Sequence, residues 1–236
     1  MKNIIIPDYH SSWAPFFKAY QKELELIDSQ IDGDDYNPAP ENVLRFAKFP
    51  VQDIKVVILG QDTYPQKGVA TGRSFEVGGL KTWTEWYRQV SLKHIVQNIY
   101  GCYTGKSPYC NYSDIQKQIR NGDFKILPPD KIFDSWNEQG VLCLNAALTC
   151  RVGEPGSHSD YWREFTEGLI RFISINNENI KWFLWGAEAK KFTYLIENGK
   201  IYASRHPMMC SETYKDDFLK NPCFKDTMKE INWLGI

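Results

Sequence analysis

The sequence predicts an α/β fold in which a parallel β-sheet lies between layers of helices, as in doubly wound proteins. Four short runs are almost continuously apolar, which is typical of strands buried on both faces of such a sheet. Segments with helical periodicity separate these runs, and that alternation indicates βαβ units. Hydrophobic residues make up 42% of the 236 residues, so the chain can bury a substantial core.

The predicted strands and helices follow one another in a regular order. The strands span residues 55–60, 140–145, 181–186 and 200–204. Helices are expected over 13–24 after a cap at Ser11 and Ser12, over 84–100 with Gly101 as the stop, over 158–175, and over 187–198 before Gly199. No repeat or low-complexity tract divides the chain, so residues 1–236 are predicted to form a single domain.

The segment 101–130 interrupts this order and is predicted to be an excursion from the core. It is polar, ends in two prolines and carries four basic residues, with a short helix expected near 113–120. The basic residues form either a solvated face or a contact with nucleic acid.

Charge and cysteine content limit the classes of partner and location. The 28 basic and 29 acidic side chains leave a net charge of -1, so nucleic-acid binding would depend on a local patch or on hydroxyl and backbone contacts. The six cysteines show neither a C-x-x-C pair nor a spacing suited to zinc, so we expect free thiols and no metal. Residues 1–8 are too short an apolar stretch for a signal peptide, and no run could span a membrane. A cytoplasmic, reducing location is expected.

Polar side chains follow three of the four predicted strands at the point where each strand ends. Asp62 comes just after the first strand, Asn145 closes the second, and His206 follows the fourth. Ligands of open parallel sheets bind beyond the carboxyl ends of the strands. Each residue alone could cap a turn or hydrogen-bond within the core. Together they predict one site, because buried polar groups at strand ends need partners or a ligand.

Other catalytic motifs are absent. Gly105-Lys106-Ser107 is similar to a phosphate-binding loop, but its spacing from Gly101 is one residue too short and it follows a helix. There is no G-x-G-x-x-G, G-x-S-x-G or H-E-x-x-H.

Several blocks, in order along nearly the whole chain, resemble the family 1 uracil-DNA glycosylases. They are Gly60-Gln61-Asp62-Thr63-Tyr64-Pro65, Ser74-Phe75, Ser91-Leu92-Lys93-His94-Ile95, GVLCLNAALT at 140–149, Ser157-His158, Trp185-Gly186 with Ala189-Lys190-Lys191, and His206-Pro207. The resemblance implies a three-layer α/β/α fold with a central four-stranded parallel sheet. It also implies hydrolytic removal of uracil from DNA, leaving an abasic site, after the nucleotide is flipped out of the duplex. Such enzymes need no metal or cofactor, and nothing in the sequence requires more than a monomer.

The resemblance assigns the chemistry to three residues. Asp62 would lie beneath the sugar, stabilise its developing positive charge and orient the attacking water. A neutral His206 would donate a hydrogen bond to uracil O2, where negative charge accumulates. The Asn145 amide would donate to O4 and accept from N3–H, a pattern that cytosine reverses.

The remaining assignments concern the faces of the base and the DNA strand. Phe75 would stack on the pyrimidine, Tyr64 would exclude the methyl group of thymine, and Gln61 would contribute backbone contacts. Candidates for contacts to DNA phosphates or for insertion into the base stack are Ser91, Ser157, Met208, Met209, Cys210 and Ser211. For the serines, helix capping is the alternative role.

The chain departs from the family pattern at three places. Thr63 stands where proline is usual, and Pro65 stands where many members carry histidine. The DNA-inserting loop usually reads His-Pro-Ser-Pro-Leu-Ser, whereas this chain has His-Pro-Met-Met-Cys-Ser from His206. Cys210 aligns with the leucine that fills the vacated stack, so Met208 or Met209 is the alternative wedge. A weaker wedge would favour single-stranded substrate, which has no unstacking cost.

Three other functions are compatible with parts of the sequence. The first is a related scaffold that binds DNA or a partner with little catalysis, which the altered loop favours. The second is a glycosylase for another modified pyrimidine, which Tyr64 opposes if the base is bulky at C5. The third is an unrelated doubly wound enzyme for small molecules. An excision assay on a uracil-containing oligonucleotide distinguishes the first function from a uracil-DNA glycosylase. A panel of modified bases distinguishes the second.

Overall fold

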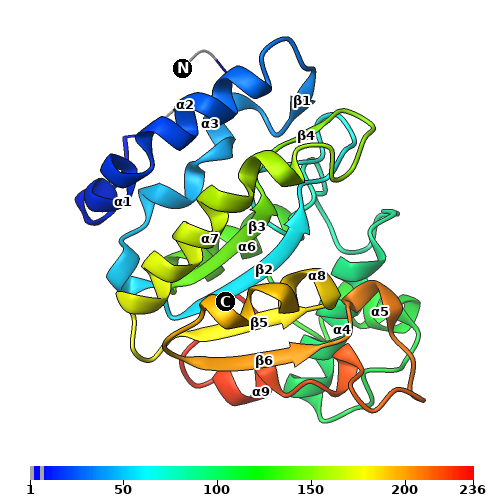
Figure 1. Cartoon of the computed structure of the whole chain (residues 1–236). Helices are drawn as coiled ribbons and strands as arrows, with labels where there is room; N and C mark the ends of the chain where they lie inside the picture. Colours follow the sequence, from blue (N-terminus) through cyan, green and yellow to red (C-terminus); the bar gives the residue numbers. More distant parts are fainter. Residues whose placement is uncertain (1–2, 6–7) are drawn as a thin grey trace.

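A four-stranded parallel sheet forms the centre of the protein in the computed structural model, which describes residues 3–5 and 8–236. Its strands are β2 (Val56–Asp62), β3 (Val141–Ala147), β5 (Lys181–Trp185) and β6 (Lys200–Ser204), in the order β3-β2-β5-β6. All three strand pairs are parallel, and the four arrows point to the same side in Figure 1. The four predicted strands are confirmed within one or two residues at each end. The prediction that residues 1–8 are no signal peptide falls partly outside the described residues.

Successive side chains of each strand pack against different helical layers, as the alternation of a β-strand requires. From β2, Val57 and Leu59 join the core that contains residues of α1, α2 and α7. Val56 and Ile58 join the core on the other face, with residues of α4, α6 and α9. Burial on both faces explains why the strands are continuously apolar, and the three-layer α/β/α fold is confirmed.

The helices that cover the sheet differ widely in length. They are α1 (Ala14–Ala19), α2 (Gln21–Gln30), α3 (Pro40–Val43), α4 (Val90–Thr104), α5 (Tyr112–Asn121), α6 (Pro129–Glu138), α7 (Ser159–Ile175), α8 (Ala187–Lys190) and α9 (Cys223–Thr227). Short 3-10 turns are η1 (Ser11–Trp13), η2 (Arg45–Lys48), η3 (Val51–Asp53), η4 (Lys191–Leu195), η5 (Pro207–Met209) and η6 (Phe218–Lys220). A small antiparallel sheet of β1 (Tyr36–Asn37) and β4 (Cys150–Arg151) was not predicted, because two residues are too few to show a period.

The N-terminal helix differs from its prediction. It is broken at Tyr20 into α1 and α2, and its first turn is η1, whose cap is the His10 side chain and not Ser11 or Ser12. The Nδ1 of His10 accepts from the Ser12 backbone N–H. The Tyr20 ring lies directly against Gly168 of α7, where no other residue would leave room for it. Packing between helices therefore decides where this one bends.

The helix predicted at 84–100 begins and ends later, because α4 runs from Val90 to Thr104. Residues 86–89 are instead without helical structure, and the Tyr87 hydroxyl is fixed by a 2.6 Å hydrogen bond to that of Tyr112. Gly101 is not the stop. That role belongs to Gly105, which adopts the left-handed conformation at φ 69°.

The helix predicted at 187–198 is also shorter than expected. Only α8 is α-helical, η4 continues it as a 3-10 turn, and Gly199 has the positive φ of 104° expected of a stop. The backbone N–H groups of Glu197 and Asn198 donate to the Ser174 hydroxyl of α7, which draws these residues out of the helix. By contrast, the helix predicted at 158–175 is confirmed as α7.

The segment 101–130 contains the predicted short helix as α5. Ile115 and Phe124 of this segment are buried in the same core as α4. The six cysteines are free thiols. Within residues 3–5 and 8–236, no helix has the length and apolar character needed to cross a membrane.

Candidate active site

The carboxyl ends of β2 and β3 bring the first polar residues together. Gly60 of β2 is the direct partner of Asn145 of β3, and Asp62 follows two residues later. By strand alternation, Gly60 and Asp62 share the sheet face of Val56 and Ile58, which is the face covered by α4. Gln61 therefore points to the opposite face, where its exposed side chain lines a pocket with Ser159 and Arg163 of α7. Only the backbone of Gln61 can serve the site on the α4 side.

Asn145 fills the space that Gly60 leaves. The Asn145 side chain is buried, with 2% exposure. A Cβ atom at position 60 would lie 2.5 Å from Asn145 Oδ1 and 2.8 Å from Ser74 Cβ. The Ser74 hydroxyl is held in turn by a 3.0 Å hydrogen bond to the Ile58 carbonyl oxygen. Glycine at position 60 is thus a requirement of the way the Asn145 amide is packed.

Asp62 carries a buried carboxylate oxygen with no hydrogen-bond partner. Among the described residues, only two buried polar side-chain atoms lack a hydrogen-bond partner, Asp62 Oδ2 and the Trp185 indole nitrogen. Both residues end strands of the central sheet, on the same side of it. Burial raises the pKa of the Asp62 carboxyl, and the backbone N–H groups of Gly156 and Asp62 oppose this rise. Unpaired buried groups are costly, and their occurrence at one sheet end marks a place for a ligand.

His206 presents a neutral imidazole with a defined tautomer. The Met208 backbone N–H donates to His206 Nδ1 over 3.1 Å. Because Nδ1 is an acceptor, the ring proton is on Nε2, which is left as a donor. Burial also lowers the pKa of His206, which favours the neutral ring. The imidazole packs on Gly186 at the end of β5, where a Cβ would be 3.0 Å from His206 Cβ.

Phe75 connects the two halves of the site. It directly follows Ser74, which packs beside Gly60, and its ring centroid is 6.1 Å from that of His206. It is the one non-glycine residue with positive φ among those described, at 64°. Such a conformation costs about 1–2 kcal/mol in an ordinary residue, and strain of this kind is concentrated at functional sites. Residues from four separate parts of the chain therefore lie close together at this end of the sheet.

Tyr64 lies in the loop after β2, and residues from other parts of the chain hold this loop in place. The Pro65 carbonyl oxygen accepts from the Gly153 N–H and from the Asn37 side-chain amide, each at 2.9 Å. Burial raises the pKa of Tyr64. Thr63 is buried, with 3% exposure.

The three candidate serines have different surroundings. Ser91 lies in the first turn of α4, whose N-cap residue Gln89 makes no side-chain cap. The Ser157 hydroxyl accepts from the Arg151 N–H at 2.7 Å and so supports the turn after β4. The Ser211 hydroxyl is 2.9 Å from that of Thr213. Ser157 thus has a structural role in its loop, while Ser91 stands at an open helix start.

In the loop after His206, the two methionines are exposed to solvent and the cysteine is turned toward the protein. Met208 and Met209 are exposed, at 58% and 55%. The Cys210 thiol turns inward and donates to the Pro207 carbonyl oxygen at 3.3 Å, and burial raises its pKa to about 12. The methionines project from this loop, and the cysteine helps to hold it.

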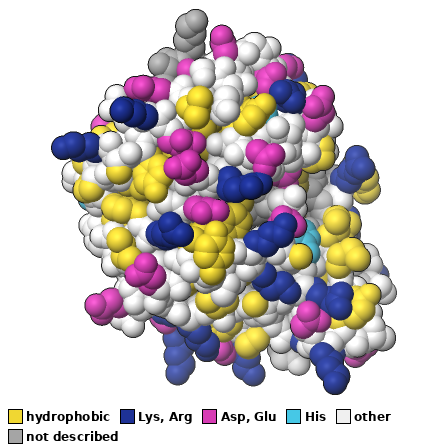
Figure 2. Space-filling model, viewed as in Figure 1, with side chains coloured by type: hydrophobic (Ala, Val, Ile, Leu, Met, Phe, Trp, Pro, Cys, Tyr) yellow, Lys and Arg dark blue, Asp and Glu magenta, His cyan; other side chains and the backbone are white. Residues whose placement is uncertain are grey.

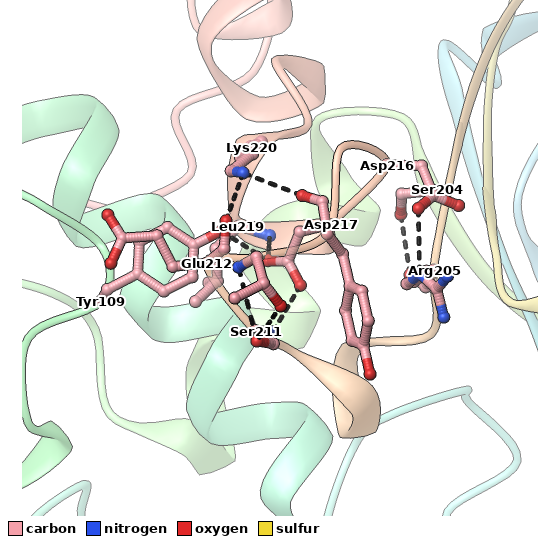
Figure 3. Close-up of polar contacts among 11 residues, drawn as sticks. Tyr109, Ser204, Arg205, Ser211, Glu212, Asp216, Asp217, Leu219 and Lys220 are labelled. Carbon is pink, nitrogen blue, oxygen red and sulfur yellow. Dashed lines mark hydrogen bonds and ion pairs between the residues drawn. The ribbon is translucent and has the colours of Figure 1, made fainter.

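Sequence reasoning missed the residues that fix this loop, of which Asp217 is central (Figure 3). Its buried carboxylate accepts from the backbone N–H groups of Ser211 at 2.6 Å and Leu219 at 2.9 Å, and from the Tyr109 hydroxyl at 2.8 Å. Arg205 binds the neighbouring Asp216 at 2.9 Å. A lone aspartate in a polar run gives no sequence signal for such a role.

Two histidines also support the site without belonging to it. His94 of α4 contacts the Pro207 carbonyl oxygen through Nδ1, joining α4 to η5. His158 is fully buried between the Thr149 hydroxyl and Asp34, which also binds Arg151 at 3.0 Å. This second network anchors the turn that carries Gly156 toward Asp62.

Charges of both signs are interspersed over the face seen in Figure 2, in keeping with the near-neutral total. Within the described ranges, no group of three His, Cys, Asp or Glu side chains could hold a metal ion.

Comparisons with known proteins point to one family of enzymes. The chain is 34% identical to the uracil-DNA glycosylase of Buchnera aphidicola subsp. Cinara cedri, over 99% of this chain and 97% of that enzyme. It is 34% identical to the enzyme of Deinococcus radiodurans, over 76% of this chain and 64% of the other. The chain therefore spans just under two thirds of that relative's length. No family model matches the chain.

Solved structures extend the likeness to three dimensions. The crystal structure of mimivirus uracil-DNA glycosylase superposes with a TM-score of 0.66 at 27% identity, covering 84% of this chain and 69% of that one. With more than 30% identity over almost the full length of a curated relative, the chain belongs to the uracil-DNA glycosylases.

Proposed function

We propose that this chain is a family 1 uracil-DNA glycosylase that hydrolyses the bond between uracil and deoxyribose in DNA, with Asp62 and His206 as its catalytic residues. The observation that carries the proposal is the unpartnered buried carboxylate oxygen of Asp62, at the same sheet end as a neutral, Nε2-protonated His206. These are the two groups that the reaction requires on opposite sides of the breaking bond.

The reaction separates charge along one bond. As the C1′–N1 bond breaks, its electron pair leaves with the base, so that positive charge grows on the sugar and negative charge on uracil O2. The Asp62 carboxylate stabilises the sugar cation and orients the water whose oxygen bonds to C1′. The water releases a proton and the uracil anion takes one up from solvent. His206 Nε2–H donates to O2 throughout, and the absence of charge on its ring keeps this proton in place.

Base selection depends on Asn145 and the two aromatic side chains. A fixed amide at Asn145 accepts from uracil N3–H and donates to O4, and cytosine would leave both groups unpaired. Phe75 covers the face of the pyrimidine. Tyr64, held by the fixed loop after β2, occupies the space next to C5 that a methyl group would need.

Alanine at Gly60 is expected to disturb this selection. The added Cβ would displace the Asn145 amide, so we expect kcat/KM for uracil excision to fall about 10- to 100-fold. Steady-state kinetics on a uracil-containing oligonucleotide measures the effect. Gly68→Ala is the control, since Gly68 has a positive φ of 77° but no atoms within 4 Å of a new Cβ. It should lose stability without losing catalysis, and an unchanged kcat/KM in Gly60→Ala would contradict the role given to Asn145.

We propose further that Met208 and Met209, not Cys210, fill the space left by the flipped nucleotide. The exposure of the two methionines and the inward thiol of Cys210 support this assignment. Methionine is apolar but flexible, so its insertion costs more side-chain entropy than that of leucine. A preference for single-stranded substrate follows, because there the wedge is not needed.

Asp217→Asn tests how much the enzyme depends on a fixed loop. The amide replaces one acceptor oxygen by a donor, so at least one of the three donors to Asp217 loses its partner, at a cost of about 1.5–3 kcal/mol. We expect kcat/KM to fall about tenfold more on duplex than on single-stranded substrate. Asp216→Asn is the matched control, because the Asp216 carboxylate is exposed and its one ion pair in the described part of the chain is with Arg205. Equal losses on both substrates would rule out a role in duplex opening.

The organisation of the enzyme is part of the proposal. Residues 1–236 form one domain that acts as a monomer. Tyr109 of the segment 101–130 supports the DNA-inserting loop through its hydrogen bond to Asp217. Its basic residues stay candidates for contact with DNA, and a cytoplasmic location stays a prediction. Release of uracil from single- and double-stranded oligonucleotides, without strand cleavage, is the expected result of the primary assay. No release from either would overturn the proposed function.

A further inference from the structure

Phe75 keeps its strained backbone conformation in a segment that has no backbone hydrogen bonds of its own. Residues 71–76 form neither helix nor strand, and among the described residues no hydrogen bond joins a backbone group of this segment to another backbone group. A positive φ of 64° is unfavourable for a phenylalanine, so the surrounding structure has to impose it. Side chains must therefore hold the segment.

An ion pair joins the residues on either side of Phe75. The Arg73 guanidinium lies 3.3 Å from the Glu76 carboxylate, so the pair spans Ser74 and Phe75. Both side chains are largely buried, with 11% and 12% exposure. The second Glu76 oxygen accepts from the Thr71 hydroxyl at 2.5 Å. Because three side chains of this short segment meet at one carboxylate, the backbone between them has little freedom to rotate.

Two elements outside the segment hold this group in place. Arg45 of η2 donates to the Thr71 carbonyl oxygen at 2.8 Å and lies 3.8 Å from the Glu76 carboxylate. Asp134 of α6 binds Arg73 at 2.7 Å. We call the side chains of Arg45, Thr71, Arg73 and Glu76 the Glu76 clamp. Glu76 is its centre, because its carboxylate contacts the other three side chains.

The segment that the clamp holds also forms part of the candidate active site. The Ser74 Cβ packs beside Gly60. The Phe75 ring centroid lies 5.6 Å from that of Trp185 and 6.1 Å from that of His206. The same six residues therefore carry both the clamp and the ring that is proposed to stack on uracil.

We propose that Arg73 and Glu76 are positioning residues that hold the Phe75 ring where stacking on uracil requires it. The inference rests on the proposed function, because it concerns the same site. Both residues act through Phe75 and not on the base itself. They keep the strained conformation populated before the nucleotide arrives, and a preformed ring avoids the free-energy cost of ordering it during binding.

Glu76→Gln is expected to lower kcat/KM for uracil release about 5- to 30-fold at a temperature well below its Tm. Glutamine has one acceptor oxygen and no charge, so it cannot hold both arginines and the Thr71 hydroxyl. Without the clamp, the strain of a positive φ lowers the population of this Phe75 conformation by about that factor. Glu230→Gln is the matched control, since Glu230 also binds a partly buried cation, Lys181 at 2.6 Å, but at the start of β5. It should keep the wild-type kcat/KM.

A double-mutant cycle separates positioning from a general loss of stability. In a Phe75→Ala background the ring is absent, so Glu76→Gln should lower kcat/KM further by less than about twofold. Thr71→Val, which removes only the hydroxyl bond to Glu76 and leaves the ion pairs, gives the same cycle if Glu76→Gln does not fold. Equal losses with and without the Phe75 ring would overturn the proposal.

Fluorine NMR gives a measurement that does not depend on catalysis. In protein labelled with 4-fluorophenylalanine, the Phe75 signal is the one that disappears in Phe75→Ala. It should be a single line in wild type and in Glu230→Gln, and a broadened or split line in Glu76→Gln, because the ring then samples a second position. An unchanged line in Glu76→Gln would contradict the clamp. If the line changes but the wild type releases no uracil, the clamp is supported and the proposed function alone is rejected.

Discussion

Asp62→Asn is expected to lower kcat for uracil release about 10³-fold or more while leaving the affinity for uracil-containing DNA within a few fold. The substitution keeps the size of the side chain and removes the negative charge that stabilises the sugar cation. Single-turnover kinetics with excess enzyme, together with a binding titration on the same oligonucleotide, separates the two quantities. Near wild-type excision by this variant would show that the assignment of Asp62 is wrong.

The same variant should be more stable than wild type at neutral pH. Burial raises the folded-state pKa of Asp62 above its ordinary value, so ionisation of this group opposes folding. The penalty is present at pH values above the folded pKa and is relieved as the pH falls below the unfolded value. An increase in Tm for Asp62→Asn at pH 7 that disappears at low pH is the expected signature. For catalysis the sign is opposite, because activity of the wild type should be lost as the pH falls through the raised pKa.

His206→Ala is expected to reduce kcat about 10²- to 10³-fold, with a much smaller change in KM. One well-placed donor to a developing oxyanion has an effect of this size, and the ground-state carbonyl of uracil gains much less from it. Burial lowers the pKa of His206, so the wild-type ring should stay neutral at pH values where an ordinary histidine is already protonated. Loss of kcat through protonation of this ring is therefore expected only below the ordinary histidine range. Measurement of kcat and KM from pH 5 to 9 tests both the loss of kcat in His206→Ala and the pH dependence of the wild type.

Two controls separate the chemistry of His206 from its support of the loop. His10→Ala removes a histidine that also accepts from a backbone N–H two residues later, but at the remote turn η1. It should leave kcat unchanged. His206→Gln, whose side chain can still accept from Met208 N–H, should bind uracil-free DNA as wild type does. Equal loss of kcat in His10→Ala and His206→Ala would indicate a general effect of destabilisation.

The central sheet is predictable from the sequence because its signal is local. Each strand is buried on both faces, so apolar residues run on without interruption between polar ends. The long helix α7 has the same advantage, since its apolar stripe continues for several turns. Helix ends are different. Tyr87 fits the helical period of α4 but lies outside it, because its hydroxyl is bonded to Tyr112, which is 25 residues away.

Some residues of the candidate site are likewise predictable from the sequence, and others are not. Asp62, Asn145 and His206 can be found from sequence because each follows a recognisable strand, and parallel strands end at one edge of a sheet. The role of Gly60 could not be found, because only the pairing with β3 places the Asn145 amide against it. Asp217 and Tyr109 were missed for a similar reason, since their contact joins residues that are 108 positions apart.

The sequence alone therefore determined the layer architecture, the family resemblance and the edge of the sheet at which the polar residues meet. These depend on periodicity and on order along the chain, which are fixed by covalent connection. Only the tertiary structure decided the tautomer of His206, the unpaired oxygen of Asp62, the direction of Met208 and Cys210, and the strained conformation of Phe75. The loop from His206 to Cys210 is held in place by Asp217 and His94, and all of these features exist only after the layers have packed.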